Sequence, residues 1–450
     1  MDAFVIQGGK PLHGTVQVHG SKNAALPLMV LALLTDEPVV LHDVPDLVDI
    51  ANMGRLLQTL GCTCESELGP DNRRRLRLQV DDPAPCEAHY DIVRTMRASI
   101  CVLGPLLARR GQARVSMPGG CNIGDRPVDL HRRGLEALGA KIHLEEGYIV
   151  ATGPGGSGGN SGVDGGKRLR GARVFLGGTF GSTVLGTANV MSAATLAEGT
   201  TVIESAACEP EIEDVARLLN RMGARISGAG TPRVVVKGVS KLHGAEHRIL
   251  ADRIEAGTYI CAAAITKSPL TLTNCPVDTL GALLDRLRIV GVKVEPANGA
   301  DNQDRLRQTV TVTAQEPLHP VHVVTQPHPG FPTDLQAQLM AMLCLARGNS
   351  FVAEKIFPDR FLHVAELSRM GAKLMRSGAS VLVSGVPELI GAPVMASDLR
   401  ASASLVLAGL AARGTTIINR VYHLDRGYEK MEKILQSLGA QIERVDASNL

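Results

Sequence analysis

EIEDVARLLNRMGARIS (residues 211–227) decides the fold, because the phrase Met222-Gly223-Ala224 within it recurs along the chain. In every copy a helical run ends in a large apolar residue, then Gly, then a small or apolar residue. Self-similarity at a nearly regular spacing indicates a repeat architecture. Six such units fill the 450 residues. The copies are Leu60-Gly61-Cys62, Leu138-Gly139-Ala140, Met222-Gly223-Ala224, Val290-Gly291-Val292, Met370-Gly371-Ala372 and Leu438-Gly439-Ala440.

Each unit carries the same parts around this phrase. An apolar helical stretch comes first, and a tight turn and a short β-branched strand follow it. A second, amphipathic helix comes next, in which Ile212, Val215 and Leu219 share one face. The repeated Gly then ends that helix, because Gly adopts the left-handed conformation of a C-cap without a Cβ penalty. The first strands are predicted within residues 36–41, 110–115, 198–203, 267–272, 347–352 and 413–418.

The first helix of each unit is expected inside the protein. Residues 24–34 and 259–265 are apolar throughout. Residues 401–412 contain only two polar side chains, both of them serines. A helix that is apolar on every side lies in a large core or in a membrane, and these runs are shorter than the ~20 residues that span a bilayer. The chain exceeds the ~250–300 residues of a single core. We therefore predict two inside-out α/β barrel-like domains, each of three pseudo-symmetric βαβαββ repeats with central buried helices.

The domain boundary is expected near Leu250, where the third unit ends. One domain would comprise residues 22–250 and carry a cysteine loop, and the other would comprise residues 1–21 and 251–450. Residues 4–18 read as a strand-turn-strand lead-in to the first unit. The active site would lie in the cleft between the two domains.

Composition limits the function classes. A formal net charge of +2 gives no case for nucleic-acid binding, and the basic run at 73–77 is best interpreted as a solvated hairpin. The nine cysteines show neither CxxC pairs nor metal-ligand spacing, so we expect buried thiols in a reducing compartment and no metal. The N-terminus lacks a signal-peptide pattern, which indicates a cytoplasmic protein without a membrane partner. The glycine-rich residues 153–166 are expected to form a mobile surface insertion.

Polar residues gather where the central helices begin. Ser21-Lys22-Asn23 opens the first unit, residues 330–334 open the fifth, and residues 397–400 open the sixth. Helix N-termini packed together would form an anion site. Capping alone explains each start equally well, but a cation such as Lys22 is disfavoured at a helix N-terminus unless an anion joins it.

A cysteine lies in the loop PGGCNIGDRP (residues 118–127), although cysteines are normally buried. Arg126 would lower the pKa of the Cys121 thiol and make it reactive. The alternatives are a packed loop cysteine and a mobile lid that carries a proton donor. Arginines on turns and helix starts suit bidentate binding of phosphate and carboxylate, although each alone could be a surface salt-bridge residue. These are Arg97, Arg126, Arg360, Arg400 and Arg426.

Together these motifs resemble the UDP-N-acetylglucosamine enolpyruvyl transferases, also called UDP-N-acetylglucosamine 1-carboxyvinyltransferases. The matching stretches span nearly the whole chain and are specific as a set. They are GSKNAALPL (20–28), TMRASI (95–100), PGGCNIGDRPVDLH (118–131), AATLAEGTT (193–201), EPEI (209–212), FPTDLQAQ (331–338), RFLHVAELSRMGA (360–372), SDLRASASLVLAG (397–409) and DRGYEK (425–430).

The resemblance implies a fold and an activity. The family's fold, two inside-out α/β domains of three repeats, agrees with the repeat pattern. In the implied reaction phosphoenolpyruvate donates its enolpyruvyl group to the 3′-hydroxyl of UDP-N-acetylglucosamine and phosphate leaves. This is the first committed step of peptidoglycan precursor synthesis, and so belongs to cell-wall biogenesis, cell shape and cell division. The resemblance implies two small-molecule substrates, no cofactor, and reaction with fosfomycin, an epoxide mimic of phosphoenolpyruvate.

The resemblance also implies roles for single residues. Asp334 would act on the sugar hydroxyl, as a base or in the final proton transfer. Cys121 would be a general acid toward C3 or assist product release. Lys22, Arg126 and Arg426 would hold the phosphate and carboxylate of phosphoenolpyruvate. The other implied binding residues are Asn23 for the sugar, Arg97, Arg360 and Arg400 for the cleft and its closure, Arg126, Pro127, Val128, Asp129, Leu130, Thr179, Phe180 and Gly181 for the uridine diphosphate, and Ile356 and Asp398.

The sequence departs from the family pattern at the implied nucleotide site. Thr179-Phe180-Gly181 stands where the family often has Ser-Val-Gly, and Gly177 stands where it often has a lysine. Phe180 is bulkier than Val, so nucleotide affinity could differ. The glycine-rich insertion precedes the same strand.

Three other functions compete with this interpretation. A 5-enolpyruvylshikimate 3-phosphate (EPSP) synthase shares the fold and the donor but lacks the cysteine lid, so PGGCNIG argues against it. An RNA cyclase needs a nucleotide-bound histidine, and none of the 13 histidines lies in such a motif. A non-catalytic sensor or scaffold would have no need for the intact set of Lys22, Cys121, Asp334 and Arg426.

Overall fold

The structure, a computed structural model, describes residues 2–69, 73–119, 128–155, 167–297 and 304–449. These residues form two compact units. The N-terminal unit contains residues 20–119 and 128–250, and the C-terminal unit contains residues 2–19 and 251–449, in each case apart from the gaps above. Cys121, Arg126 and Pro127 lie outside the described residues, as does most of the glycine-rich segment 153–166.

Three four-stranded sheets with the same topology form the outer layer of the N-terminal unit. The strands are β3 (Val39–His42), β4 (Cys62–Leu68), β5 (Arg74–Val80), β6 (Glu87–Ala88), β7 (Gln112–Ser116), β8 (Lys141–Glu145), β9 (Tyr148–Thr152), β10 (Arg173–Phe175), β13 (Thr200–Glu204), β14 (Arg225–Ser227), β15 (Arg233–Lys237) and β16 (Ala245–Arg248). Their orders are β16-β3-β5-β4, β6-β7-β9-β8 and β10-β13-β15-β14. In each sheet the first pair is parallel and the other pairs are antiparallel.

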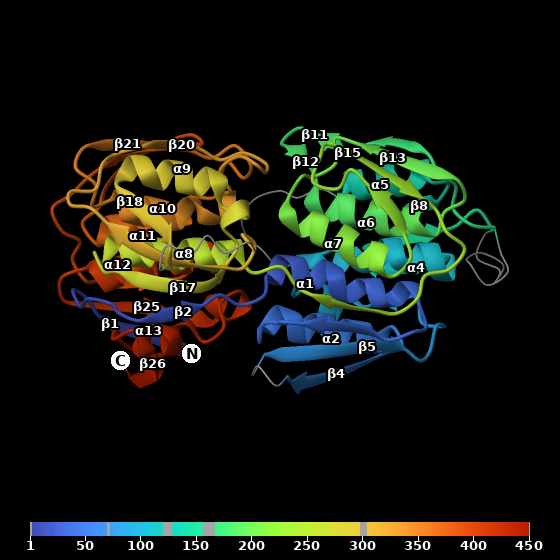
Figure 1. Cartoon of the computed structure of the whole chain (residues 1–450), viewed down its shortest axis with the longest axis horizontal. Helices are drawn as coiled ribbons and strands as arrows, with labels where there is room; N and C mark the ends of the chain where they lie inside the picture. Colours follow the sequence, from blue (N-terminus) through green and yellow to red (C-terminus); the bar gives the residue numbers. More distant parts are fainter. Residues whose placement is uncertain (1, 70–72, 120–127, 156–166, 298–303, 450) are drawn as a thin grey trace. The chain divides into compact units, whose positions relative to one another are not determined.

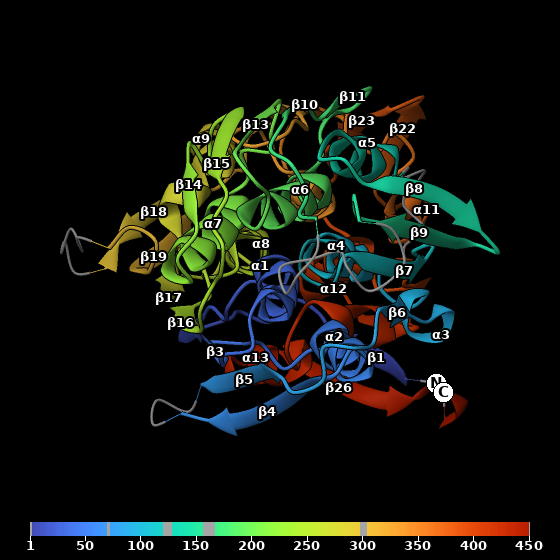
Figure 2. The same cartoon turned by 90° about the vertical axis from the view of Figure 1, so that its right-hand side faces the viewer.

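The first helices of the repeats occupy the centre of this unit, inside the three sheets (Figure 2). They are α1 (Lys22–Met29), α4 (Leu103–Arg110) and α6 (Val184–Thr195). The 3-10 helix η2 (Arg97–Val102) precedes α4, and the short helix α3 (Tyr90–Val93) precedes η2. The second helices are amphipathic, as α7 shows by burying Ile212, Val215 and Leu219. They are α2 (Val48–Thr59), α5 (Asp129–Ala137) and α7 (Pro210–Arg221).

The C-terminal unit repeats this arrangement. Its strands are β1 (Asp2–Gln7), β2 (Thr15–Gln17), β17 (Leu270–Cys275), β18 (Val292–Pro296), β19 (Gln308–Ala314), β20 (His322–Val324), β21 (Asn349–Ala353), β22 (Lys373–Ser377), β23 (Ser380–Ser384), β24 (Pro393–Met395), β25 (Thr415–Asn419) and β26 (Gln441–Asp446). The central helices are α8 (Arg253–Ile265), α10 (Gln336–Leu343) and α12 (Leu399–Ala411), and the second helices are α9 (Gly281–Val290), α11 (Leu362–Arg369) and α13 (Met431–Ser437). Figure 1 labels most of these elements. The three central helices contact one another, and every residue of α8 and α10 is buried. The predicted inside-out fold class is therefore confirmed.

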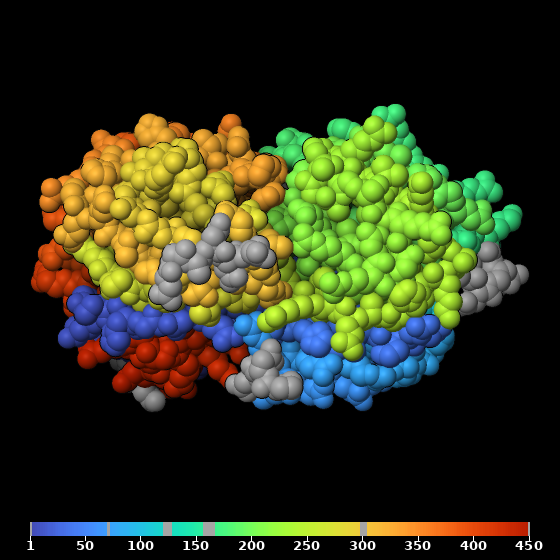
Figure 3. Space-filling view, viewed as in Figure 1, coloured from blue at the N-terminus to red at the C-terminus, as the bar shows by residue number. Residues whose placement is uncertain are grey.

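The start of the chain completes two sheets of the C-terminal unit. β1 lies between β25 and β26 and pairs antiparallel with both, and β2 pairs parallel with β17. The space-filling view accordingly shows the blue chain start between the yellow and red segments of this unit (Figure 3). The sixth repeat therefore takes its missing hairpin strand from the opposite end of the sequence.

The six repeated glycines all follow the second helix of their unit in the left-handed region. Their φ angles lie between 77° and 98°. An L-residue with a Cβ is strained there, whereas Gly is not. The predicted helix ends at Gly61, Gly139, Gly223, Gly291, Gly371 and Gly439 are thereby confirmed.

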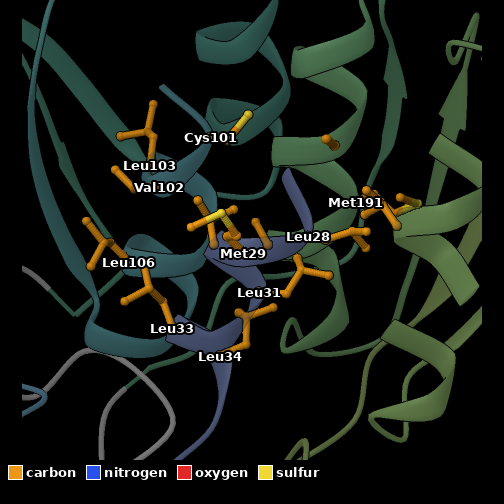
Figure 4. Close-up of a cluster of buried hydrophobic side chains, with 14 of the residues drawn as sticks. Leu28, Met29, Leu31, Leu33, Leu34, Cys101, Val102, Leu103, Leu106 and Met191 are labelled. Carbon is orange, nitrogen blue, oxygen red and sulfur yellow. The ribbon is translucent and has the colours of Figure 1, made fainter. Parts of the chain in front are cut away.

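The first central helix differs in detail from its prediction. The apolar run 24–34 divides into α1 and the 3-10 helix η1 (Val30–Leu34), and Pro27 lies inside α1. Proline lacks the N–H that would donate to the preceding turn. Leu33 of η1 lies beside Leu106 of α4, and Leu28, Met29 and Leu31 belong to the same aliphatic core (Figure 4).

Surface and thiol predictions can also be compared with the structure. The basic run forms cross-strand ion pairs, Arg75 with Glu67 and Arg77 with Glu65, so it is a solvated hairpin face rather than a phosphate patch. The eight cysteines in the described residues are free thiols, and five of them are buried. Among the described residues, no helix is long and apolar enough to cross a membrane.

Candidate active site

Asp334 lies in a 3-10 turn (η5, Thr333–Leu335) directly before α10 and faces two arginines. Arg360 Nη1 donates to Oδ1 at 2.7 Å, and Arg400 Nη2 donates to Oδ2 at 3.0 Å. The side chains of Arg360 and Arg400 are 8% and 3% exposed, whereas that of Asp334 is 25% exposed. Burial alone would raise the pKa of the Asp334 carboxyl, but the charges and hydrogen bonds of Arg400 and Arg360 hold it well below its usual value. Asp334 is therefore ionised at neutral pH.

Tyr428 links the three central helices behind this ion pair. Arg400 Nη1 (α12) and Gln338 Nε2 (α10) both donate to the Tyr428 hydroxyl at 3.2 Å. Thr258 Oγ1 (α8) lies 2.9 Å from the same hydroxyl and donates its own proton to the Ile254 carbonyl, so the Tyr428 O–H donates to Thr258. This network fixes the Arg400 guanidinium and thereby the orientation of Asp334.

Glu354 supports the other arginine. Its carboxylate is buried and accepts hydrogen bonds from Thr333 Oγ1 at 2.9 Å and from the Ile356 N–H at 2.8 Å. Thr333 Oγ1 in turn accepts from Arg360 Nη1 at 3.1 Å. Glu354 thus holds the loop that carries Ile356 and Arg360 against the turn that carries Asp334.

Asp398 is the N-cap of α12, where its Oδ1 accepts from the N–H groups of Arg400 and Ala401. Burial would lower the pKa of Arg360, but the charge of Asp334 and then that of Asp398 raise it, so Asp398 lies near the ion pair. Arg426 is half-buried at the end of η6 (Val421–Arg426), two residues before Tyr428. The structure therefore brings Asp334, Arg360, Arg400 and Asp398 together.

In the N-terminal unit, Lys22 is the first residue of α1 and is almost fully buried. Its Nζ lies 3.1 Å from Asp49 Oδ2 in the first turn of α2. The anion that offsets a cation at this helix N-terminus is thus available within the protein. Ser21 caps the helix by accepting from the Ala24 N–H, and Asn23 is half-buried beside Lys22.

Arg97 is the first residue of η2, and its charge acts on the pKa of His131, a buried histidine in the first turn of α5. Burial, together with the charge of Arg97, lowers the pKa of His131 to about 3. Val128 and Asp129 lie at the start of the same helix, and the Leu130 side chain packs over Gly178.

Thr179 and Phe180 form the tip of a small hairpin between β11 (Gly177–Gly178) and β12 (Gly181–Ser182). The Phe180 side chain is 54% exposed, and Gly181 has a φ of 103° that a larger residue would strain. A Cβ at Gly177 would lie 2.6 Å from the Phe175 ring. A lysine at position 177 would therefore require the exposed Phe175 ring to move.

Sequence reasoning missed the partners that hold the site residues. Asp49, Glu354, Tyr428, His131 and Asn189 belong to this group. Tyr428 and His131 lie within quoted motifs, but no local signal marked them as partners of residues in other repeats. Among the described residues, no three His, Cys, Asp or Glu side chains are arranged to hold a metal ion.

Solved structures with this architecture include an enolpyruvyl transferase and an EPSP synthase. The enolpyruvyl transferase NikO from Streptomyces tendae has a TM-score of 0.85, 24% identity and 99% coverage of each chain. The EPSP synthase from Acinetobacter baumannii has a TM-score of 0.74 and 18% identity over 99% of this chain and 100% of that chain. At these identities the likeness establishes the shared fold.

Sequence comparisons identify the family. The family model of EPSP synthase (3-phosphoshikimate 1-carboxyvinyltransferase) matches residues 6–435. A relative from Methylacidiphilum infernorum is 50% identical over 99% of both chains, and one from Anaeromyxobacter sp. (strain Fw109-5) is 51% identical over 99% of this chain and 100% of its own. Both carry the name UDP-N-acetylglucosamine 1-carboxyvinyltransferase. The chain therefore belongs to this family of enolpyruvyl transferases, as the sequence motifs indicated.

Proposed function

We propose that the protein transfers the enolpyruvyl group of phosphoenolpyruvate to the 3′-hydroxyl of UDP-N-acetylglucosamine and releases phosphate. The observation that carries this proposal is 50–51% identity over 99% of the chain to relatives with that name. A shikimate-phosphate acceptor has less support, because the EPSP synthase structures share only 18% identity. The ionised Asp334 between two buried arginines is compatible with proton chemistry on a phosphorylated substrate pair.

The reaction needs balanced proton traffic. The 3′-oxygen adds to C2 of phosphoenolpyruvate and loses its proton, while C3 gains one, which gives a tetrahedral phospho-ketal. The bond from C2 to the phosphate oxygen then breaks, and C3 loses a proton. Asp334 accepts the hydroxyl proton or takes part in the final transfer. A carboxylate with such a low pKa is a weak base. The hydrogen bonds from Arg360 and Arg400 must therefore weaken when Asp334 accepts a proton.

The remaining site residues are assigned to the same substrates. Lys22, Arg126 and Arg426 hold the phosphate and carboxylate of phosphoenolpyruvate, and Cys121 acts as a general acid or assists product release. Asn23 binds the sugar, and Arg97 supports the site. The uridine diphosphate set comprises Arg126, Pro127, Val128, Asp129, Leu130, Thr179, Phe180 and Gly181, and Ile356 and Asp398 complete the binding set.

The cellular role follows from the reaction. Enolpyruvyl UDP-N-acetylglucosamine is a peptidoglycan precursor, so the protein serves cell-wall biogenesis and, through it, cell shape and division. We place it in the cytoplasm. The absence of a membrane-spanning helix among the described residues is compatible with this location.

Phosphate release tests the activity directly. The purified protein is mixed with phosphoenolpyruvate and UDP-N-acetylglucosamine, and released phosphate is measured against consumed sugar nucleotide. We expect equal amounts of the two and no release when shikimate 3-phosphate replaces the sugar nucleotide. Release of phosphate with shikimate 3-phosphate would overturn the proposal. A failure to release phosphate with either acceptor would overturn it as well.

Fosfomycin should alkylate Cys121 when UDP-N-acetylglucosamine is present. A thiolate opens the epoxide without loss of atoms, so intact-mass spectrometry should detect one adduct with the full mass of the inhibitor. Cys121→Ser should abolish the adduct. Cys208→Ser is the matched control and should retain it, because burial and then the nearby Glu209 and Glu213 raise the pKa of the Cys208 thiol. An unmodified wild-type protein would contradict the role of Cys121.

A further inference from the structure

Asn189 lies in the middle of the central helix α6 and is 1% exposed. Its Oδ1 accepts from the Gly104 N–H at 2.8 Å, and its Nδ2 donates to the Ile100 carbonyl at 2.8 Å. The same Nδ2 lies 2.9 Å from His131 Nδ1. A buried amide is stable only when its donors and acceptors are satisfied. Asn189 therefore ties η2 and α4 to the first turn of α5.

These contacts determine the state of the His131 ring. The Gly104 N–H can only donate, so it fixes which end of the Asn189 amide is oxygen. Nδ2 is then a donor, and His131 Nδ1 must accept. An imidazole whose Nδ1 accepts is neutral and carries its proton on Nε2. Burial and the charge of Arg97 favour the same neutral form by lowering the pKa of His131 to about 3.

The Nε2–H of His131 is the hydrogen-bond donor that the contacts with Asn189 do not use. Within the described part of the chain, no hydrogen bond engages that atom, although the residue is only 4% exposed. Arg97, at the start of η2, is the charged group that acts on the ring. A protonated, buried imidazole close to the half-buried Arg97 would cost free energy through desolvation and repulsion. A neutral imidazole instead offers an N–H donor without adding charge, which suits an anionic oxygen.

We propose that His131 is a further substrate-binding residue, whose Nε2–H donates to a phosphate oxygen of the nucleoside diphosphate, and that Asn189 is the positioning residue that holds this donor. The inference rests on the proposed function, because Leu130, in the same helical turn, belongs to the uridine diphosphate set. Asn189 acts through His131 and through the Ile100 carbonyl, three residues beyond Arg97. One buried amide thus sets the position of two segments that carry binding residues.

Direct binding measurements test the role of His131. The dissociation constants of UDP and of UDP-N-acetylglucosamine are measured by calorimetry for wild type, His131→Phe and His131→Gln. We expect about tenfold weaker binding for Phe, which corresponds to about 1.4 kcal/mol, and recovery of most of the affinity for Gln, whose amide N–H can replace Nε2–H. His143→Phe is the matched control, because His143 is exposed on β8 of the same unit, and it should bind as wild type does.

A structural role without substrate contact gives a different result. His131→Phe would then lower the unfolding temperature but leave both dissociation constants unchanged, which would overturn the inference. A higher KM for phosphoenolpyruvate with unchanged binding of UDP would also overturn it. Wild-type protein that binds no UDP-N-acetylglucosamine would instead reject the proposed function, so the two failures are distinguishable.

Asn189→Asp tests the positioning role. A carboxylate cannot donate to Nδ1, so the ring must carry a proton there. At high pH the neutral ring would then lack Nε2–H, and at low pH the imidazolium would regain it. We expect UDP binding by this variant to strengthen as pH falls from 8 to 5.5, relative to wild type over the same range. A pH dependence identical to that of wild type would overturn the role of Asn189.

A wild-type measurement covers the case in which these variants fail to fold. The ring nitrogens of selectively labelled histidine are followed by NMR during titration with UDP. The His131 Nε2–H resonance should shift on binding, and Nδ1 should remain an acceptor from pH 5.5 to 8. An Nδ1–H tautomer, or an unshifted Nε2 resonance at saturation, would contradict the proposal.

Discussion

Replacing Asp334 by Asn should lower the turnover number by about 10²–10⁴-fold, the range expected for loss of a proton-transfer group. The amide cannot accept a proton from the sugar hydroxyl, although its size is nearly unchanged. Arg360 and Arg400 would also lose their shared counter-ion. Because the Asp334 side chain is 25% exposed, we expect a loss of about 2–4 kcal/mol in the free energy of unfolding, below the ~3–5 kcal/mol for breaking a fully buried pair. Steady-state kinetics and denaturant unfolding measure the two effects separately.

Asp359→Asn is the matched control for this variant. Asp359 lies on the same loop as Arg360 but is 83% exposed and pairs with Arg376. Exposed pairs contribute about 0–1 kcal/mol, so both turnover and stability should stay close to wild type. A near-normal turnover number for Asp334→Asn would remove this carboxylate from the mechanism.

The pH dependence follows from the sign of the shift. The folded-state pKa of Asp334 is depressed, so its contribution to stability is fully present above the unfolded value of about 3.9 and is lost as pH falls through the lower folded value. The stability difference between wild type and Asp334→Asn should therefore be constant from pH 5 to 8. Any acid limb of the rate profile above pH 5 should persist in the residual activity of the variant, because another group causes it.

The fold could be predicted because its signals are local. Each repeated Gly follows an amphipathic helix within a few residues, and a positive φ at that position is a property of the chain itself. The apolar runs are likewise readable without tertiary contacts, since a helix without a polar face must be buried. The pairing of β1 with β25 and β26 could only be suspected, because it joins residues at opposite ends of the sequence.

The site was less predictable, because its contacts join distant repeats. Asp334 meets Arg360 and Arg400 across 26 and 66 positions, and only the family resemblance placed these residues in one site. Lys22 shows the limit of a local argument. A cation at a helix N-terminus suggested an external anion, but Asp49, 27 positions away, supplies a carboxylate at 3.1 Å. Asn189 carries no sequence signal of its own, because its helix also contains Thr187, Ser192 and Thr195.

Replacing Arg400 by Lys should lower kcat/KM by about 10- to 100-fold, although the charge is kept. The two terminal nitrogens of the guanidinium hold two partners at once, since Nη2 donates to Asp334 and Nη1 donates to Tyr428. An ammonium group is a compact point charge and cannot span both. Hydrogen bonds to charged groups contribute about 1.5–3 kcal/mol, so losing one of them accounts for this range. Asp334 would then be oriented mainly by Arg360, on one of its two oxygens.

The stability of Arg400→Lys should fall as well, by about 2–4 kcal/mol, because a 3% exposed cation would lose hydrogen bonds and leave the Tyr428 hydroxyl short of a donor. Arg413→Lys is the control, since Arg413 follows α12, is 68% exposed and pairs with Glu388. That exposed pair tolerates a point charge, and its variant should match wild type in both measurements. Full activity in Arg400→Lys would mean that charge alone, rather than the fork of two donors, orients Asp334.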